Sequence, residues 1–132
     1  MTIKSHLNHI QIYVSDKKRS FDFYKKLLIY LGYKIIEENN SLGMRNGKSD
    51  IWFKEFPKDG KKNYNRRNVG INHIAFGVSD KKYINKFMKE FLIPNKIKTL
   101  YGSPRKFPEY TKDYYAVYFE DPDKIKLEVM YL

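Results

Sequence analysis

The chain has 132 residues, of which 42% are hydrophobic and 17% aromatic, and its formal net charge is +11. This is the composition of a globular protein, and no apolar run approaches the roughly 20 residues that span a bilayer, so a membrane protein is excluded. The sequence has no cysteine and its first residues lack the features of a secretory signal, so disulfides are excluded and a cytoplasmic location is expected.

The positive charge raises the question of nucleic-acid binding, because Lys and Arg that neutralise phosphates provide most of the non-specific affinity. Only five of the 26 basic residues are Arg, however, and Arg is favoured for bidentate recognition of phosphates and bases. We therefore expect no nucleic-acid partner, although the positive electrostatic field of the chain suits anionic small molecules. A basic cluster is interpreted as part of a solvated loop: Lys61, Lys62, Arg66 and Arg67.

The first half of the chain predicts one strand, one helix and three further strands. Residues 7–14 alternate as in a half-buried strand, with an aliphatic face and a mixed face that carries His9, Gln11 and Tyr13. Apolar residues at helical spacing follow until Gly32, which ends the helix. Strands are then expected at residues 33–38, 41–45 and 50–56, the last two separated by the hairpin dipeptide Asn46-Gly47.

A polar, basic linker is expected at about residues 57–68, and the second half then repeats the order of the first. The strand at residues 71–78 carries His73, Ala75 and Gly77 on one face. A helix follows and ends before Pro94.

The rest of the second half predicts three strands. A weak strand at residues 97–101 precedes a long loop at residues 102–113, which we expect to cover a cavity. Strands at residues 114–120 and 125–131 follow, joined by a turn.

An internal repeat organises these elements. Asn72 to Lys82 is identical to Asn8 to Lys18 at 8 of 11 positions, at an offset of 64 residues. The repeat predicts two tandem βαβββ modules, at about residues 5–56 and 69–132. Because 132 residues are few for two independent domains, we expect a single domain that spans residues 1–132 and shares one core.

The repeat also pairs His9 with His73. In the last predicted strand Glu128 is an acid among apolar residues, on the same face as Met130. A lone strand histidine is more often a hydrogen-bonded or surface residue, but two at matched positions can face a common cavity. Together with Glu128 they would offer two imidazoles and a carboxylate, a ligand set for one divalent ion such as Fe, Mn, Ni or Zn, with coordination positions left open.

Several motifs point to a known superfamily. They are Asn8-His9-Ile10, Val14-Ser15-Asp16, Ser20 to Tyr24, Leu31-Gly32-Tyr33, Asn72 to Phe76, Tyr114 to Asp123, and Ile125 to Val129. As a set they resemble the vicinal oxygen chelate (VOC) superfamily, which includes glyoxalase I, fosfomycin and bleomycin resistance proteins, methylmalonyl-CoA epimerase and extradiol dioxygenases. The resemblance implies an α+β fold of two βαβββ modules that form a curved mixed sheet around a cavity. It also implies that His9, His73 and Glu128 occupy metal-ligand positions.

The chain departs from this resemblance at two positions. Aligning the last strands of the modules places Trp52 opposite Glu128, where glyoxalase I and the epimerase often have a fourth ligand, Glu. A register shifted by two residues would put Asp50 there instead. Lys124 takes the place of Gly in an Asp-Pro-Asp-Gly turn, so it carries a penalty if the turn needs a positive φ.

The leading functional hypothesis is a metal-dependent enzyme that binds adjacent oxygens of a small substrate. Isomerisation of the glyoxalase (lyase) type, epoxide opening by a transferase and ring cleavage by a dioxygenase all remain open. The catalytic candidates are Glu128, Tyr13 and Tyr118, and the substrate-pocket candidates are Gln11, Trp52, Ala75, Gly77 and Met130. The alternative is a metal-free module that sequesters a drug or aromatic metabolite, since Trp52 and the many Tyr residues suit flat ligands.

The expected partners are a small-molecule substrate and a second copy of the chain. Open curved sheets leave strand edges that must be covered, and proteins of the resembling superfamily often pair. We therefore expect a homodimer with no membrane partner.

Overall fold

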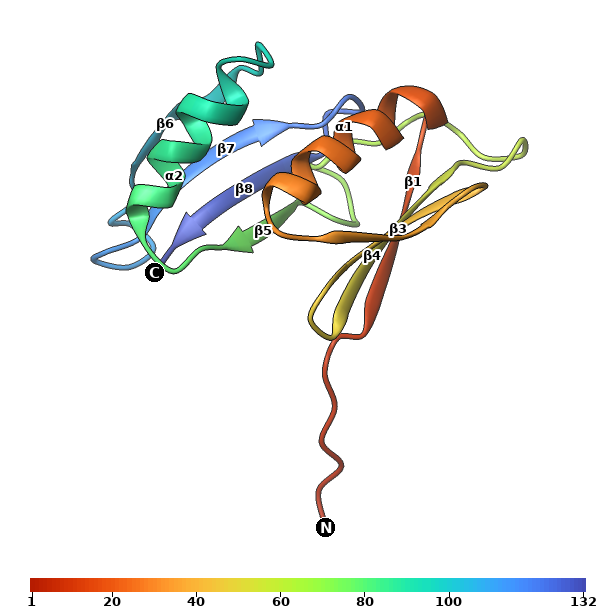
Figure 1. The fold of residues 1–132 in the computed structure, drawn as a ribbon, viewed down its shortest axis with the longest axis horizontal. Coiled ribbons are helices and arrows are strands. Elements are labelled where there is room, and N and C mark those ends of the chain that lie inside the picture. The colour runs from red at the N-terminus through yellow and green to blue at the C-terminus, as the bar shows by residue number, and fades with distance from the viewer. The chain divides into compact units, whose positions relative to one another are not determined.

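The computed structural model describes residues 1–132. The chain divides into two compact units, residues 1–62 and 63–132, and the division falls inside the predicted linker. Each unit contains a strand, a helical segment and three more strands, and each has its own four-stranded mixed sheet that does not close into a barrel (Figure 1). The two repeated βαβββ modules are thereby confirmed, while the shared core stays a prediction.

Unit 1 consists of β1 (His9–Val14), α1 (Lys17–Tyr30), β2 (Lys34–Glu38), β3 (Ser41–Asn46) and β4 (Ser49–Glu55). The strand order is β1-β4-β3-β2, with β1 parallel to β4 and the other pairs antiparallel. Asp16 caps α1, and its side chain accepts a hydrogen bond from the Arg19 amide at 2.9 Å. The helix packs on the sheet through Tyr24, whose ring stacks on Phe53 of β4 at 3.9 Å.

Unit 2 consists of β5 (His73–Gly77), α2 (Lys81–Phe87), the π-helical turn η1 (Met88–Leu92), β6 (Thr99–Lys106), β7 (Tyr115–Glu120) and β8 (Lys126–Tyr131). The strand order β5-β8-β7-β6 repeats that of unit 1. Helix α2 packs on β7 and β8, where Phe87 contacts Phe119 edge-on at 5.5 Å between ring centroids (Figure 1). Because strand side chains alternate, the helix covers the face opposite His73, and the His73 face is left for other contacts.

The prediction of a loop over residues 102–113 is wrong for residues 102–106, which belong to β6. The pairing of β6 with β7 is interrupted between Leu100 and Arg105, where Tyr101 and Gly102 have φ angles of 60° and 63°. Inside this bulge the Ser103 hydroxyl accepts a hydrogen bond from the Tyr118 amide at 2.9 Å and replaces a backbone partner. Gly and Pro therefore occur here without ending the strand, because they sit where the ladder is already broken.

The interpretation of Arg66 as part of a solvated loop is also wrong. Its side chain is half-buried, and Nη1 donates to Oε2 of Glu120 on β7 at 2.5 Å. The residues just before β5 are therefore fixed to the sheet of unit 2. The neighbouring basic residues Lys61, Lys62 and Arg67 are exposed, as expected.

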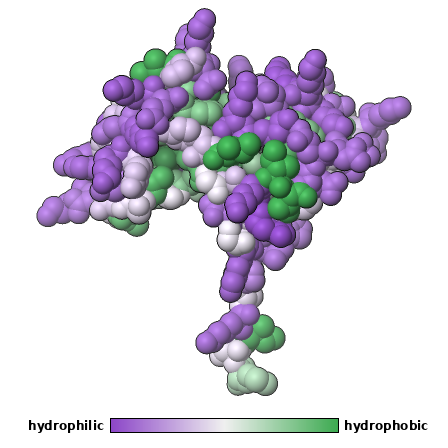
Figure 2. All heavy atoms as spheres, viewed as in Figure 1, coloured by the Kyte–Doolittle hydropathy of each residue, from purple (hydrophilic) through white to green (hydrophobic).

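None of the helices combines the length and the hydropathy needed to cross a bilayer. The face drawn in Figure 2 is mostly hydrophilic, in keeping with 26 Lys and Arg residues in the chain. The apolar side chains are concentrated between each helix and its sheet, with Leu28, Phe53, Ile84 and Leu127 all fully buried.

Lys124 has a φ of 64°, which confirms that the turn between β7 and β8 requires the left-handed region. We expect Lys124→Gly to raise the free energy of unfolding by about 0.5–1 kcal/mol, because Gly adopts this conformation without the Cβ penalty. Urea unfolding followed by circular dichroism measures the change.

Two other lysines provide controls for this substitution. Lys96 has a φ of 56°, so Lys96→Gly should also stabilise the protein, whereas Lys112→Gly, at a residue without positive φ, should not. All three changes remove one positive charge. A Lys124→Gly protein that is no more stable than wild type would contradict the assignment of strain to this turn.

Candidate functional site

Three residues from three strands of unit 2 meet on the sheet face away from α2. In β8, Glu128 lies opposite Ala75 of β5 on one side and opposite Tyr118 of β7 on the other. His73 is on the same face, two residues before Ala75. Glu128 is completely buried although it is an acid. A buried carboxylate is costly unless its oxygens have partners, so its surroundings decide what this site can do.

The two oxygens of Glu128 have different surroundings. Oε1 accepts a hydrogen bond from the Tyr114 hydroxyl at 2.5 Å. Oε2 has no hydrogen-bond partner, and it lies 3.3 Å from Nε2 of His73. Tyr114 therefore restrains the carboxylate and leaves Oε2 directed at the imidazole. The sequence interpretation gave Tyr114 no role. Tyr114 and Tyr118 fall on the same face of the predicted strand at residues 114–120, and this alternation could have identified Tyr114 as a neighbour of Glu128.

The side chain of Asn72 makes Nδ1 of His73 a hydrogen-bond donor. Its amide Nδ2 donates to the backbone carbonyl of Arg66 at 3.1 Å, and its Oδ1 lies 2.8 Å from Nδ1 of His73. A carbonyl can only accept, so the amide nitrogen must face Arg66 and the amide oxygen must face the ring. Nδ1 is then a donor, and in the neutral ring Nε2 presents its lone pair to Glu128.

This pair fits a divalent cation. When the imidazole is neutral, Nε2 of His73 and Oε2 of Glu128 are two acceptors that face each other at 3.3 Å, and a positive charge between them, either a proton or a metal ion, removes their repulsion. Two ligand atoms about 2.1 Å from one ion, at angles of 90–109°, are about 3.0–3.4 Å apart. An imidazole fixed through its other nitrogen is also the usual form of a metal-ligating histidine.

Aromatic side chains cover the carboxylate. Tyr118 is buried in a cluster with Phe107 and Ala116, and its ring lies 6.2 Å from that of His73. Burial raises the pKa of Tyr118, and the charge of Glu128 raises it further. Burial and the hydrogen bond to Glu128 raise the pKa of Tyr114 in the same way. Both hydroxyls therefore stay protonated at neutral pH and act as hydrogen-bond donors.

Unit 1 repeats the first part of this arrangement. Nδ1 of His9 lies 2.9 Å from Oδ1 of Asn8, as Nδ1 of His73 lies near Asn72. Gln11 is opposite Trp52 in the sheet, as Ala75 is opposite Glu128. The structure thus has the register in which Trp52, and not Asp50, corresponds to Glu128.

Trp52 and Asp50 are both held by neighbours within unit 1. A Cβ on Gly43 would come within 2.8 Å of the Trp52 ring, so the absence of a side chain there lets the indole lie across β3. Asp50 is buried, and each of its carboxylate oxygens accepts a hydrogen bond from Arg45, at 2.7 and 2.8 Å. This bonding lowers the pKa of Asp50. Asp50 is therefore engaged in a structural ion pair.

The predicted site residues fall into two groups. Unit 2 brings together His73, Tyr118 and Glu128, with Ala75 beside them and Gly77 opposite Met130. Unit 1 contains the others: His9, Gln11, Tyr13 and Trp52. The structure contains no group of three or more potential ligand side chains. The three-ligand set of His9, His73 and Glu128 stays a prediction.

Comparison of the sequence with known proteins identifies relatives over nearly its whole length. Residues 6–129 match the family model described as Glyoxalase/Bleomycin resistance protein/Dioxygenase superfamily. The chain is 33% identical over 128 residues to the uncharacterized protein YqjT of Bacillus subtilis, covering 94% of this chain and 97% of that protein. It is 29% identical over 125 residues to the metallothiol transferase FosB of Staphylococcus epidermidis, covering 93% and 79%.

Solved structures show the same similarity. A candidate glyoxalase from Bacillus halodurans has a TM-score of 0.85 and 26% identity, covering 96% of this chain and 95% of the other. Lactoylglutathione lyase from Agrobacterium tumefaciens has a TM-score of 0.71 and 18% identity, covering 98% and 96%. The second similarity supports the fold alone.

The ion pair between Arg45 and Asp50 should make stability depend on pH. The pKa of Asp50 is lower in the folded chain than in the unfolded chain, where it is about 3.9. The ionised carboxylate therefore stabilises the fold fully at pH values above the unfolded pKa, and this stabilisation is lost as the pH falls through the folded pKa. Asp50→Asn should therefore have a lower free energy of unfolding than wild type at neutral pH, and this difference should be smaller in strong acid. Urea unfolding of both proteins at neutral pH and in strong acid measures this difference.

Asp22 supplies the control, because its ion pair with Lys26 is largely exposed. Asp22→Asn should show little difference from wild type at either pH. A gap for Asp50→Asn that is equal at neutral and acidic pH would contradict the electrostatic explanation and would point to packing instead.

Proposed function

Because the chain belongs to the Glyoxalase/Bleomycin resistance protein/Dioxygenase superfamily, we propose that it is a divalent-metal-dependent enzyme acting on a small substrate with adjacent oxygens. The observation that carries this proposal is the pair of acceptors, Nε2 of His73 and Oε2 of Glu128, at 3.3 Å. We propose His9 as the third ligand, since Asn8-His9 repeats the hydrogen-bonded Asn72-His73 pair. The donor set of two imidazoles and a carboxylate suits Zn, Ni, Mn or Fe.

A divalent cation bound there would supply Lewis acidity that stabilises negative charge developing on a substrate oxygen. The chain's own residues prepare the site for that chemistry. Asn72 and Tyr114 hold His73 and Glu128 in the orientation that presents one acceptor atom from each. Tyr118 keeps its proton and can donate a hydrogen bond to a substrate oxygen, while the cluster around Phe107 excludes water from one side.

Of the three reaction types, we favour the transferase. The similarity to a metallothiol transferase over most of this chain supports that choice. We do not favour isomerisation of the lactoylglutathione lyase type, because that similarity, at 18% identity, bears on the fold alone, and because Trp52 stands where a fourth carboxylate ligand would be.

A metal-free binding module is the second candidate function, and Trp52 is the observation that favours it. The indole is only half-buried and lies flat across Gly43, so it offers a ring face to a planar ligand. In that case the protein would take up an aromatic ligand and quench its only tryptophan without any divalent ion.

We also propose that the protein acts as a homodimer. In each sheet the histidine-bearing strand, β1 or β5, is at an edge, and an edge strand that carries functional residues needs a covering partner. Light scattering at micromolar concentration should give twice the mass of one chain, 15.9 kDa. A monomeric mass would refute the dimer but would not bear on the proposed metal site.

The metal proposal is tested by Glu128→Gln. The change removes the ligand charge but keeps the shape of the side chain and its acceptor for Tyr114, so the fold should persist while affinity for Zn or Mn falls by at least about tenfold. Isothermal titration with each ion and elemental analysis of untagged protein measure the effect.

His6 provides the matched control for the metal measurement. It is exposed, has no counterpart in the second module and lies before β1. His6→Asn should bind the ion as wild type does, whereas His9→Asn and His73→Asn should not. Wild-type protein that takes up no divalent ion, or equal binding by Glu128→Gln, would favour the metal-free module.

A further inference from the structure

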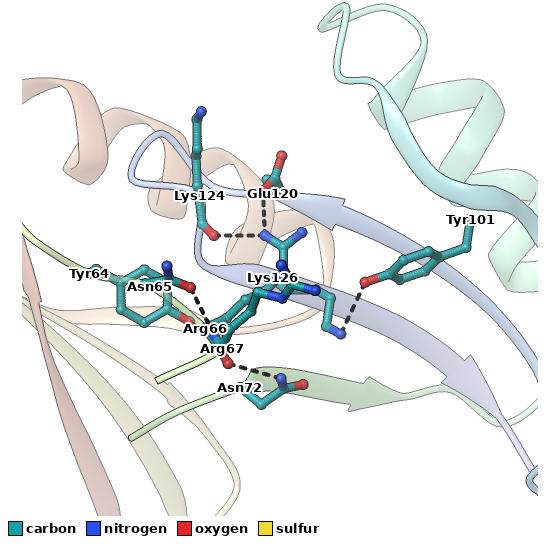
Figure 3. A pocket seen from close by; sticks show the side chains of 9 residues that line it. All are labelled: Tyr64, Asn65, Arg66, Arg67, Asn72, Tyr101, Glu120, Lys124 and Lys126. Carbon is teal, nitrogen blue, oxygen red and sulfur yellow. Dashed lines mark hydrogen bonds and ion pairs between the residues drawn. The ribbon is translucent and has the colours of Figure 1, made fainter. Parts of the chain in front are cut away.

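Unit 2 has a cavity of about 670 Å³, whose lining side chains are drawn in Figure 3. It lies between the segment that precedes β5 and the adjoining parts of β6, β7 and β8. This volume is within the usual range of small-molecule sites, about 300–1,000 Å³. None of the catalytic or pocket candidates from the sequence lines it, so the cavity is a feature that the proposed metal site does not explain.

Positive charge dominates the lining. Four basic side chains and a single carboxylate, Glu120, line the cavity. Arg66 is paired with Glu120, whereas Arg67, Lys124 and Lys126 form no ion pair. The ammonium of Lys124 is directed away from the other lining side chains, and its carbonyl faces Arg66 (Figure 3). Arg67 and Lys126 are therefore the two uncompensated cations of the lining, and an anion placed between them is attracted by both.

Hydrogen bonds fix part of this lining in place (Figure 3). Nη1 of Arg66 donates to Glu120 at 2.5 Å and to the Lys124 carbonyl at 3.3 Å. The Arg67 amide donates to Asn65 at 2.9 Å. Nζ of Lys126 donates to the Tyr101 hydroxyl at 3.2 Å and lies 5.3 and 5.5 Å from the ring centroids of Tyr101 and Tyr118. A preorganised lining lowers the entropic cost of binding.

The cavity is joined to the His73 and Glu128 pair by shared residues. Lys126 precedes Glu128 by two residues in β8, so both side chains are on the same face. The ring of Tyr118 has Lys126 near it and also contacts His73. Asn72 lines the cavity and at the same time holds the His73 ring through Oδ1. A ligand in the cavity therefore lies next to the proposed metal ligands.

We propose that this cavity binds the phosphate group of a small phosphate monoester, which is the substrate class of the neighbouring site. Beyond the pair of Arg66 and Glu120, the two positive charges of Arg67 and Lys126 match a dianion better than a singly charged carboxylate, and Arg and Lys are the usual ligands of phosphate oxygens. Anion binding stands on the cavity alone. The assignment of that anion to the substrate rests on the proposed function.

The experiment measures binding of inorganic phosphate, and then of glycerol phosphate, to the untagged full chain with and without EDTA. Isothermal titration should show saturable binding of both in either condition. Lys126→Gln and Arg67→Gln should each weaken binding at least about fivefold, since each removes one unpaired cation. Acetate at the same concentration should bind at least about tenfold more weakly than phosphate.

Lys89→Gln and Lys112→Gln are the charge-matched controls, because both lysines are exposed and neither lines the cavity. They should bind phosphate as wild type does. Equal weakening in pocket and control variants would show attraction to the net charge alone and would overturn the proposal, as would undiminished binding by Lys126→Gln and Arg67→Gln. Circular dichroism confirms that each variant is folded.

The two proposals can fail separately. Loss of phosphate binding with metal uptake retained would overturn the anion site and leave the metal-dependent enzyme standing. Phosphate binding in a protein that takes up no metal would support the anion site and refute the assignment to an enzyme substrate. Tight binding of inorganic phosphate without measurable binding of glycerol phosphate would also refute the monoester.

Discussion

The burial of Glu128 is the constraint on which the site of unit 2 depends. A carboxylate on β8 with no exposed surface loses its hydration, and this cost must be offset by groups around it. Tyr114 satisfies one oxygen through its hydroxyl, and the other oxygen has no hydrogen-bond partner and faces Nε2 of His73 at 3.3 Å. The buried Oε2 lacks a hydrogen bond, and a cation beside it would offset the remaining cost of burial. An apolar residue at position 128 would cost less, so the acid is better explained by function than by stability.

The two units have the same fold but carry different residues at the position of Glu128. Both have an Asn-His pair on the edge strand, yet the strand beside it carries Trp52 in unit 1 and Glu128 in unit 2. Gly43 makes room for the larger indole, so unit 1 accommodates an aromatic surface where unit 2 has a charge. A repeated fold therefore carries two different chemical environments, as expected when function belongs to sites and not to folds.

The sequence predicted the elements well because the repeat and the side-chain alternation are local signals. It placed His73, Tyr118 and Glu128 on one face of unit 2, and it singled out Lys124 as strained if its turn needs a positive φ, which the structure has there. It missed the hydrogen bond of Tyr114, and it misread Arg66, because each partner lies at long range: Glu128 is 14 residues from Tyr114, and Glu120 is 54 residues from Arg66. The bulge in β6 was missed since Gly and Pro normally mark loops.

Asn72 links the local folding of the segment before β5 to the orientation of the His73 ring. Its amide can orient the His73 ring only while the Arg66 carbonyl holds the other end. If that segment opens locally, the amide is free to turn, and the imidazole loses the preference for the tautomer with an unprotonated Nε2. Local order before β5 and the orientation of the His73 ring are therefore coupled. A molecule that binds and orders this segment also favours the ring orientation that Asn72 holds.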